Sequence, residues 1–395
     1  MRPSAAAVSV LAAVFAFVSA SHAASEHEVY IWQRQWTPAV RAALSQSRDV
    51  FGGVRVLVAQ AGRDGRWFAT NADPGDFAGD PRPRVAVVRY DGAGSPPEID
   101  ALEVFLRDLI QRWNAGGSAF TGVEIDYDCG SERLADYARR LRQLRLGLPR
   151  DVALSITALP SWMDADALDD VLAATDQAVL QVHAVSNPSL GLFDAERAES
   201  WIRRFALRDT KPFLIAVPAY GSRIGFDEAG RTVVVENEMP IEDVAFADAR
   251  EIYVEPADVA SLLRRLDNDP PPRWRGVVWF RLPIAGDRRA WTLDAIRDLV
   301  ASRVPQPALS AAILARDNGA SDVFIANDGA ADANAHALRV SAESCSAADA
   351  TDGWHTARWT GGWRFVPDPG LRIRGNTKRA VGWVRCKRMD QAALE

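Results

Sequence analysis

The alternation of short apolar segments with amphipathic helical segments constrains the fold of this chain more than any other feature. Eight segments rich in β-branched residues recur across about 275 residues, and most precede a stretch with apolar residues at helical spacing. The strand segments are Val29–Gln33, Val54–Ala59, Arg84–Tyr90, Gly122–Asp128, Leu154–Thr157, Val179–Val185, Phe213–Val217 and Gly276–Phe280. The helical segments are Thr37–Leu44, Pro97–Asn114, Ser131–Leu148, Asp164–Ala174, Ala195–Leu207, Pro256–Leu266 and Trp291–Val300.

This count of strand and helix units predicts an α/β fold, a (β/α)8 TIM-type barrel over residues 27–303. The second strand lacks a helix, because the stretch after it, 62–83, is rich in Gly, Asp and Pro. An open doubly wound sheet is the alternative. It accounts less well for eight units, and no Gly-rich nucleotide-binding loop follows any of the strands.

The tail, residues 306–390, has a different pattern of short alternating segments separated by Gly, Asn and Asp. It predicts a small antiparallel β domain, sandwich-like in form. The four tail tryptophans fit either a carbohydrate-binding face or the core of so small a domain; they are Trp354, Trp359, Trp363 and Trp383. Cys345 and Cys386 can close a loop of about 40 residues by a disulfide, while Cys129 is left over, either at the mouth of a site or as a buried thiol.

The N-terminus has the order of a secretory signal peptide. Arg2 precedes the apolar run 5–18, and small residues fill 19–24. We therefore expect residues 1–24 to be removed, with the mature chain starting between Ser21 and Ser25, and the protein to be exported to the periplasm or the exterior. The run is short for a membrane span, and no later segment predicts a transmembrane helix.

Charge and aromatic content narrow the class of partner. Lys plus Arg number 46 against 52 Asp plus Glu, without a dense basic run, which argues against nucleic acid. Thirteen Trp against six Tyr fit a protein that stacks sugar rings, although Trp is also a common core residue. The expected partner is a polysaccharide or oligosaccharide, and the sequence indicates no protein partner.

The strand segment Gly122–Asp128 carries the candidate chemistry. Its apolar residues point to one face of the strand, and its acidic residues, Glu124, Asp126 and Asp128, point to the other. Carboxylates crowded on one face raise the pKa of at least one of them, which suits a site that needs a proton donor beside an ionised carboxylate. In a barrel this acidic face points inward, with Asp128 at the C-terminal end, where barrel sites are built.

The stretch Phe120–Asp128 resembles the strand-four signature of glycoside hydrolase family 18, the chitinase-like barrels, whose pattern is Asp-x-x-Asp-x-Asp-x-Glu. Thr121, Glu124, Asp126 and Asp128 take the four acidic places, and only Asp126 is retained. Three other stretches resemble the family's strands six, seven and eight: Gln181–His183, Ala216–Gly221 and Gly276–Trp279. The chain is also similar to the domain of unknown function 3142 family, which pairs such a barrel with a small C-terminal extension.

The resemblance implies a role for each acidic residue. Asp128 would be the general acid, and Asp126 would orient an acetamido group of the substrate that attacks the anomeric carbon. With a substrate that lacks this group, Asp126 or Glu124 would act as nucleophile or as base for water. Glu124 lies deepest, and its position favours a structural role, as a buried partner of the other carboxylates, of Arg89 or of Arg281, over a chemical one.

Further candidates lie near the C-terminal ends of other strands. Tyr220, Gln181, His183 and Arg281 are expected to bind substrate, and His183 also fits a hydrogen-bonded core residue. Trp32, Trp162 and Trp279 are expected to form a stacking floor if they converge, and each alone also fits a core position. The five His have no His-x-His or His-Glu-x-x-His spacing, so we expect neither a metal nor another cofactor.

Three hypotheses follow from the sequence. The favoured one is an exported glycoside-hydrolase-like protein that acts on a polysaccharide, with Asp128 as general acid and Asp126 as assisting carboxylate. The second is a non-catalytic glycan-binding barrel that lost the reach of the acid, since Asp is one methylene shorter than Glu. The third is an envelope scaffold without a sugar cleft, whose tryptophans are buried.

Overall fold

The computed structural model describes residues 25–62, 67–90, 98–183, 191–236 and 246–395. The expected signal peptide, 1–24, lies outside the described residues, as do the last residues of the predicted sixth strand. Residue numbers below refer to the full chain.

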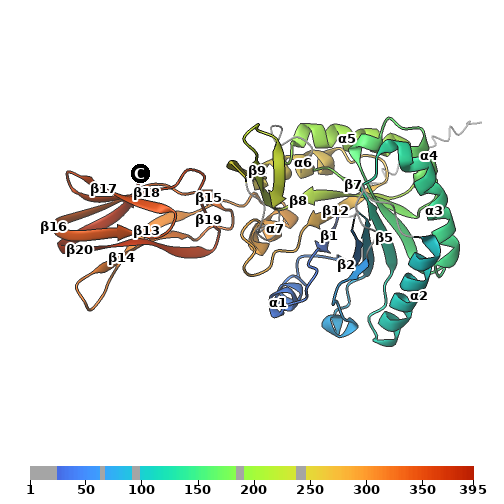
Figure 1. Cartoon of the computed structure of the whole chain (residues 1–395), viewed down its shortest axis with the longest axis horizontal. Helices are drawn as coiled ribbons and strands as arrows, with labels where there is room; N and C mark the ends of the chain where they lie inside the picture. Colours follow the sequence, from blue (N-terminus) through green and yellow to red (C-terminus); the bar gives the residue numbers. More distant parts are fainter. Residues whose placement is uncertain (1–24, 63–66, 91–97, 184–190, 237–245) are drawn as a thin grey trace, which may run out of the picture.

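Eight parallel strands form a closed barrel (Figure 1). Their order is β1-β12-β8-β7-β6-β5-β4-β2, and β1 pairs with β2 to close the ring. This confirms the predicted TIM-type barrel and excludes the open sheet. The strands are β1 (Glu26–Ile31), β2 (Gly53–Ala61), β4 (Arg84–Tyr90), β5 (Gly122–Tyr127), β6 (Ala153–Ala158), β7 (Gln177–Gln181), β8 (Phe213–Pro218) and β12 (Trp274–Phe280).

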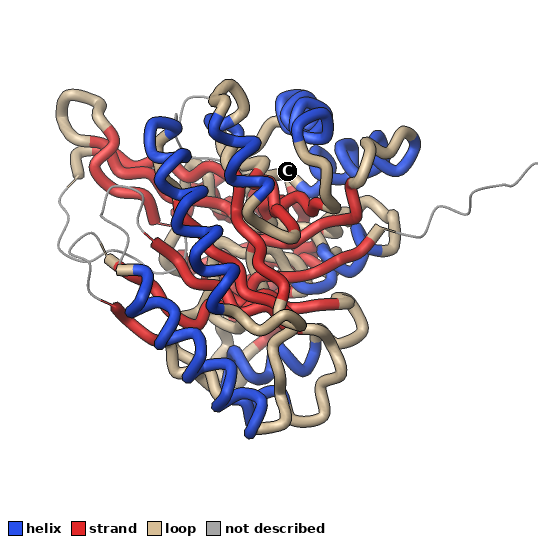
Figure 2. The backbone as a smooth tube through the Cα atoms, turned by 90° about the vertical axis from the view of Figure 1, so that its right-hand side faces the viewer, coloured by secondary structure: helices blue, strands red, loops and turns tan. Residues whose placement is uncertain are grey.

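Helices cover the outside of the barrel (Figure 2). They are α1 (Pro38–Gln46), α2 (Ile99–Ala115), α3 (Leu134–Gly147), α4 (Ala167–Ala173), α5 (Ala195–Arg208), α6 (Pro256–Asn268) and α7 (Leu293–Val300), with 3-10 turns η2 (Ser131–Arg133) and η3 (Pro160–Trp162). Between β2 and β4 the chain forms β3 (Trp67–Ala69) and the 3-10 turn η1 (Pro74–Phe77) instead of an α-helix. In the described part of the chain, no helix is both long and apolar enough to cross a membrane.

The barrel strands separate two apolar layers. The larger layer lies between strands and helices and includes the alternate β5 residues Val123, Ile125 and Tyr127. A smaller cluster fills the inside of the barrel and includes Tyr30, Leu57 and Val278. Because neighbouring residues of a strand face opposite sides, these layers fix which side chains reach the interior.

An antiparallel sheet is inserted between β8 and α6. It has the order β10-β9-β11 and consists of β9 (Gly221–Phe226), β10 (Thr232–Glu236) and β11 (Asp248–Tyr253). This segment follows β8, so it lies at the end of the barrel where the C-termini of the strands meet. None of the strand segments predicted from the sequence covers this sheet.

The tail folds as an antiparallel β unit beside the barrel (Figure 1). Its six-stranded sheet has the order β13-β14-β20-β16-β18-β17, made of β13 (Leu309–Ala315), β14 (Ser321–Asn327), β20 (Thr377–Leu394), β16 (Leu338–Ala350), β18 (Gly362–Pro367) and β17 (Trp354–Trp359). A second sheet pairs β15 (Ala333–Asn334) with β19 (Arg372–Ile373). Residues from both sheets share one apolar core, which includes Val323, Phe365 and Ile373. The domain limits 303 and 306 stay predictions.

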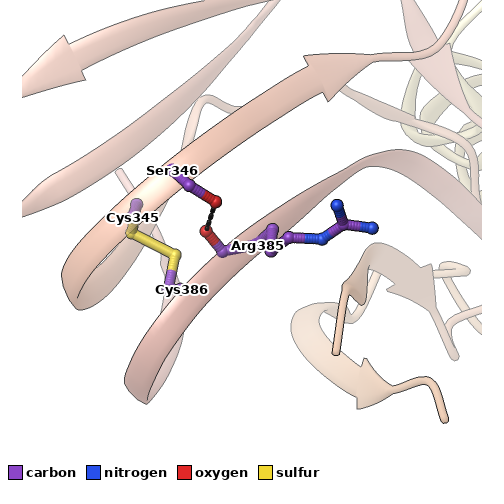
Figure 3. Close-up of a disulfide and its surroundings, with 4 residues drawn as sticks. All are labelled: Cys345, Ser346, Arg385 and Cys386. Atoms are coloured by element: carbon purple, nitrogen blue, oxygen red, sulfur yellow. Dashed lines mark hydrogen bonds between the residues drawn. A yellow bond between two sulfur atoms is a disulfide. The ribbon is translucent and has the colours of Figure 1, made fainter. Parts of the chain in front are cut away.

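A disulfide joins the two longest strands of the tail. Cys345 of β16 and Cys386 of β20 are bonded, as the sequence predicted (Figure 3). The two residues are backbone partners in the ladder, and the hydroxyl of Ser346 donates a hydrogen bond to the carbonyl of Arg385, 3.3 Å away. The cross-link therefore spans 41 residues of sequence within one pair of strands.

Candidate functional site

Strand β5 directs its acidic side chains into the barrel, because its apolar residues occupy the layer beneath the helices. Glu124 and Asp126 are both buried, and Asp128, just beyond the strand, is partly exposed. The structure therefore brings the three acidic residues to one side of one strand, at increasing distance from the barrel centre. Each of the three has a different environment.

Glu124 belongs to a polar network in the barrel core. Its carboxylate accepts hydrogen bonds from the Tyr30 hydroxyl at 2.6 Å and the Thr157 hydroxyl at 3.1 Å. It also forms an ion pair with Arg55. Burial raises the pKa of Glu124, against the opposing charge of Arg55.

The ion-pair partner of Glu124 is thus Arg55, whereas the sequence expectation named the other carboxylates, Arg89 or Arg281. Arg55 is itself fully buried, and its guanidinium also contacts Glu28 at 2.7 Å and the Gln177 side chain at 2.9 Å. Glu124 is itself buried, and its carboxylate is bonded to Tyr30, Thr157 and Arg55. Its surroundings favour the structural role over a chemical one.

Arg89 bridges the two outer carboxylates. Its guanidinium nitrogens lie 2.5 Å from an oxygen of Asp126 and 2.9 Å from an oxygen of Asp128. The Asp126 side chain is 3% exposed, whereas those of Arg89 and Asp128 are 29% and 31% exposed. Burial alone would lower the pKa of Arg89, but the charges of the two carboxylates outweigh it and raise that pKa. A permanent cation therefore lies between the carboxylates that were expected to act on each other.

Aromatic rings from three other strand ends surround this ion triad. The ring of Phe280 lies 5.0 Å from that of Trp32 and 5.5 Å from that of Tyr220. The Arg89 guanidinium lies over the Trp32 ring, 5.6 Å from its centre. We call the group formed by these aromatic rings, the triad and His183 the mouth cluster: Trp32, Arg89, Asp126, Asp128, His183, Tyr220 and Phe280.

His183 closes the cluster as a neutral side chain. Its Nδ1–H donates a hydrogen bond to the carbonyl of Ala216 at 3.2 Å, and its ring contacts Tyr220 and Phe280. Burial lowers the pKa of His183 to about 4. The neighbouring Gln181 is half-buried and donates to the His183 carbonyl at 2.9 Å.

Arg281 lies beneath the aromatic part of the cluster. It is fully buried, donates to an Asp287 oxygen at 2.6 Å, and has its guanidinium 5.6 Å from the centre of the Tyr220 ring. Arg281 thus supports Tyr220 from inside the protein.

Two of the three expected stacking tryptophans lie elsewhere. Trp279 is in the layer beneath the helices, where its indole nitrogen donates to His27 at 3.2 Å and its ring faces Trp291. Trp162 is fully buried and donates to the carbonyl of Cys129 at 2.8 Å. Phe280, the next residue after Trp279, takes the inward position.

The sequence missed Phe280 because both faces of β12 are apolar. Val277 and Trp279 pack under the helices, while Val278 and Phe280 face the interior, so hydrophobicity does not distinguish the faces. Arg89 was considered only as a partner of Glu124. Arg89 lies beside Asp126 because β4 pairs with β5, and no local sequence pattern reveals that pairing.

Within the ranges that the structure describes, no three His, Cys, Asp or Glu side chains are grouped so that they could hold a metal ion. Cys129 is buried, and burial raises the pKa of its thiol to about 12, which opposes formation of the reactive thiolate.

Comparison with known families identifies the barrel. The family model described as Domain of unknown function (DUF3142) matches residues 80–285, just over half of the 395 residues. The chain belongs to this family. A second model, Domain of unknown function (DUF8456), matches residues 310–387 in the tail. No curated protein matches the chain.

Solved structures share the barrel fold at low sequence identity. The spore cortex-lytic enzyme SleL of Bacillus cereus is 13% identical with a TM-score of 0.50, over 71% of this chain and 74% of that protein. A chitinase from Chromobacterium violaceum is 15% identical with a TM-score of 0.48, over 71% of this chain and 98% of that one. Likeness at such identities concerns the fold, so the chemistry of the DUF3142 barrel has to be argued from its own residues.

Proposed function

We propose that the mouth cluster is a carbohydrate-binding site and that this protein binds a glycan. The observation that carries the proposal is the Arg89 bridge, which holds Asp126 and Asp128 beside the Trp32 ring while Arg89 and Asp128 stay partly exposed. Sugars offer apolar C–H faces to aromatic rings and hydroxyls to fixed carboxylate and guanidinium groups. The mouth cluster contains both kinds of group, at the end of the barrel where sites are built. Of its aromatic rings, Phe280 is half-buried, whereas Trp32 and Tyr220 are buried.

The bridge favours binding over hydrolysis. A general acid has to deliver its proton to the leaving-group oxygen, and the Asp128 carboxyl is instead engaged in an ion pair with Arg89, 2.9 Å away. We therefore expect glycan binding without turnover, which is the second of the three hypotheses drawn from the sequence.

Hydrolysis with Asp128 as general acid and Asp126 as assisting carboxylate is the second candidate. It is favoured by the position of the two residues, side by side at the C-terminal end of β5, with Asp128 partly exposed. The cortex-lytic enzyme named above has the same fold. In this case substrate would have to displace Arg89 from Asp128 before proton transfer.

One binding experiment and one turnover experiment test both candidates. Purified mature protein is titrated with oligomers of N-acetylglucosamine, glucose and xylose, next to the variant Arg89→Gln and the control Arg139→Gln. Arg139 pairs with Asp136 on the exposed face of α3, so the control also removes an ion pair, far from the site. We expect Arg89→Gln to weaken binding by at least tenfold and the control to match wild type. Equal binding by all three proteins would contradict the proposal.

Turnover is measured on the same oligomers with Asp128→Asn. Binding by wild type without release of products supports a binding protein. Product release that Asp128→Asn abolishes, with binding kept, supports the hydrolase instead. The envelope-scaffold hypothesis gains if no oligomer binds, and the burial of Trp162 and Trp279 is what that hypothesis expects.

We also propose that the protein is exported. The support is the N-terminal pattern of Arg2, the apolar run 5–18 and the small residues 19–24, together with a disulfide of the kind that oxidising compartments maintain. Expression from the native N-terminus followed by N-terminal sequencing should give a first residue between Ser21 and Ser25. Recovery of the uncleaved chain in the cytoplasm would contradict export.

A further inference from the structure

A single row of side chains crosses four neighbouring strands and ends at an exposed aromatic ring. Phe68 of β3 pairs with Gln60 of β2, Gln60 pairs with Arg89 of β4, and Arg89 pairs with Asp126 of β5. Directly paired residues project to the same face of a sheet. Phe68 therefore lies on the face that carries the mouth cluster, at the far end of the row from Asp126.

The row extends past the ring of eight barrel strands. Strand β1 pairs with β2 as far as Val56, and β3 takes over as the neighbour of β2 from Ala59 to Ala61. A register shift after Leu57 turns Ala59 and Ala61 toward the helix layer, which leaves Gln60 on the inner side. Strand β3 thus adds one position to the site at the rim of the barrel.

Phe68 is separated from the packing that surrounds its neighbour. Trp67 faces the helix layer, where its ring contacts Tyr90 and Phe105 at 5.6 Å each. Phe68 is 61% exposed, and in the described residues no other Phe, Tyr or Trp is exposed to such an extent. A single exposed apolar residue needs no explanation by itself. The place of Phe68 in the row is what distinguishes it.

The residues between Phe68 and Asp126 are polar and held in place. The Arg34 guanidinium donates to the side-chain oxygen of Gln60 at 3.0 Å, and Arg89 is held by its two carboxylates. Neighbouring strands lie about 4.8 Å apart, so three strand spacings separate the ends of the row by roughly 14 Å. That length exceeds a single sugar ring and suits a short chain of linked rings.

We propose that Phe68 forms an outer stacking subsite, so that an oligosaccharide lies along the row with one ring at the mouth cluster and another on Phe68. This inference rests on the proposed glycan binding and specifies its ligand as a chain of sugars. Polar contacts from Gln60 and Arg34 serve the rings in between. The inner end supplies affinity for any length of ligand, and Phe68 adds affinity only to ligands long enough to reach it.

The test is a length series from one to six units of the same N-acetylglucosamine, glucose and xylose oligomers, titrated into the mature full-length protein. The variants are Phe68→Ala, Phe68→Trp and the control Leu146→Ala, which truncates a residue of α3 that is 89% exposed. We expect Phe68→Ala to weaken the longest ligands by roughly three- to tenfold, the worth of one aromatic contact, and to leave the shortest unchanged. Phe68→Trp should keep the increase of affinity with ligand length that wild type shows. Leu146→Ala should match wild type.

Two outcomes distinguish the failure of the outer subsite from the failure of the proposed glycan binding. If Phe68→Ala matches wild type at every length while Arg89→Gln weakens all of them, the outer subsite is wrong and glycan binding stands. If wild type binds no oligomer of any series, both are wrong. Because Phe68 is exposed, its variants should keep the wild-type unfolding transition, which is checked by circular dichroism.

Discussion

At the scale of single residues, the three acidic side chains of β5 show how environment separates chemically similar groups. Glu124 is enclosed with Arg55, Asp126 is buried against Arg89, and Asp128 shares Arg89 but reaches the surface. Alternation along the strand predicts their common face. It does not predict the arginines, which come from β2 and β4 and meet the acids only in the closed barrel.

The Glu124–Arg55 pair should be costly to break on one side. Arg55→Met leaves the Glu124 carboxylate buried without its cation, so we expect a loss of roughly 3–5 kcal/mol in the free energy of unfolding. Adding Glu124→Gln should recover part of this loss, because the buried charge is gone. Urea unfolding of the single and double variants measures both effects, and a loss below about 1 kcal/mol for Arg55→Met would contradict the role assigned to the network.

His183 should make stability depend on pH. Its pKa is lowered to about 4 in the folded protein from an ordinary 6.5, so the unfolded chain takes up a proton first as the pH falls. Stability should therefore be complete above pH 6.5 and decrease toward pH 4, by roughly 3 kcal/mol at most. Unfolding between pH 5 and 7 should show a weaker pH dependence for His183→Gln. The slope should not vanish, because burial lowers the pKa of His27 to about 4 as well.

At the scale of elements, the N-terminus of helix α7 shows what a local pattern predicts and what packing adds. Thr292 caps the N-terminus of helix α7: its hydroxyl accepts a hydrogen bond from the Ala295 amide at 3.0 Å and donates one to the carbonyl of Ala330 in the tail at 2.7 Å. The sequence around Thr292 predicts at most that this residue caps the helix. The contact with Ala330 depends on how the tail lies against the helix.

The disulfide should stabilise the tail and not the barrel. A cross-link across 41 residues contributes about 4 kcal/mol in the chain-entropy model, and both cysteines lie in the six-stranded sheet. We expect the double variant Cys345→Ala/Cys386→Ala to lower the unfolding temperature of the tail and to leave that of the barrel unchanged, in calorimetry. Reducing agent added to wild type should reproduce the effect. An equal shift of both transitions would show that the two units unfold together.

At the scale of the whole molecule, the tail contacts a segment that supports the mouth cluster. Arg374 donates to the carbonyls of Asp287 and Trp291, and Arg372 pairs with Glu255 at 2.7 Å. The Asp287 side chain holds Arg281, whose guanidinium lies over Tyr220. The Arg374 contacts connect the tail to the barrel interior through the loop 287–291, and the Arg372 contact joins the tail to the start of α6.

Removing Arg374 should loosen that loop. We expect Arg374→Ala to speed amide hydrogen exchange at Ala290, whose N–H is bonded to Asp287, by roughly tenfold or more, because a single hydrogen bond to a charged group is worth about 1.5–3 kcal/mol. The control is Arg379→Ala, which removes a similar bond to the carbonyl of Asp352 within the tail. Unchanged exchange at Ala290 in Arg374→Ala would show that the tail does not steady the loop.

The amino-acid sequence by itself determined the barrel, the tail's β character, the disulfide and the shared face of the β5 acids, because these follow from local periodicity and spacing. Only the tertiary structure decided that Phe280 rather than Trp279 faces the interior, that Arg89 lies between Asp126 and Asp128, and that Phe68 continues their row. The physical reason is that ion pairing and strand register join residues far apart in the chain. When both faces of a strand are apolar, as in β12, its sequence does not indicate which face points into the barrel.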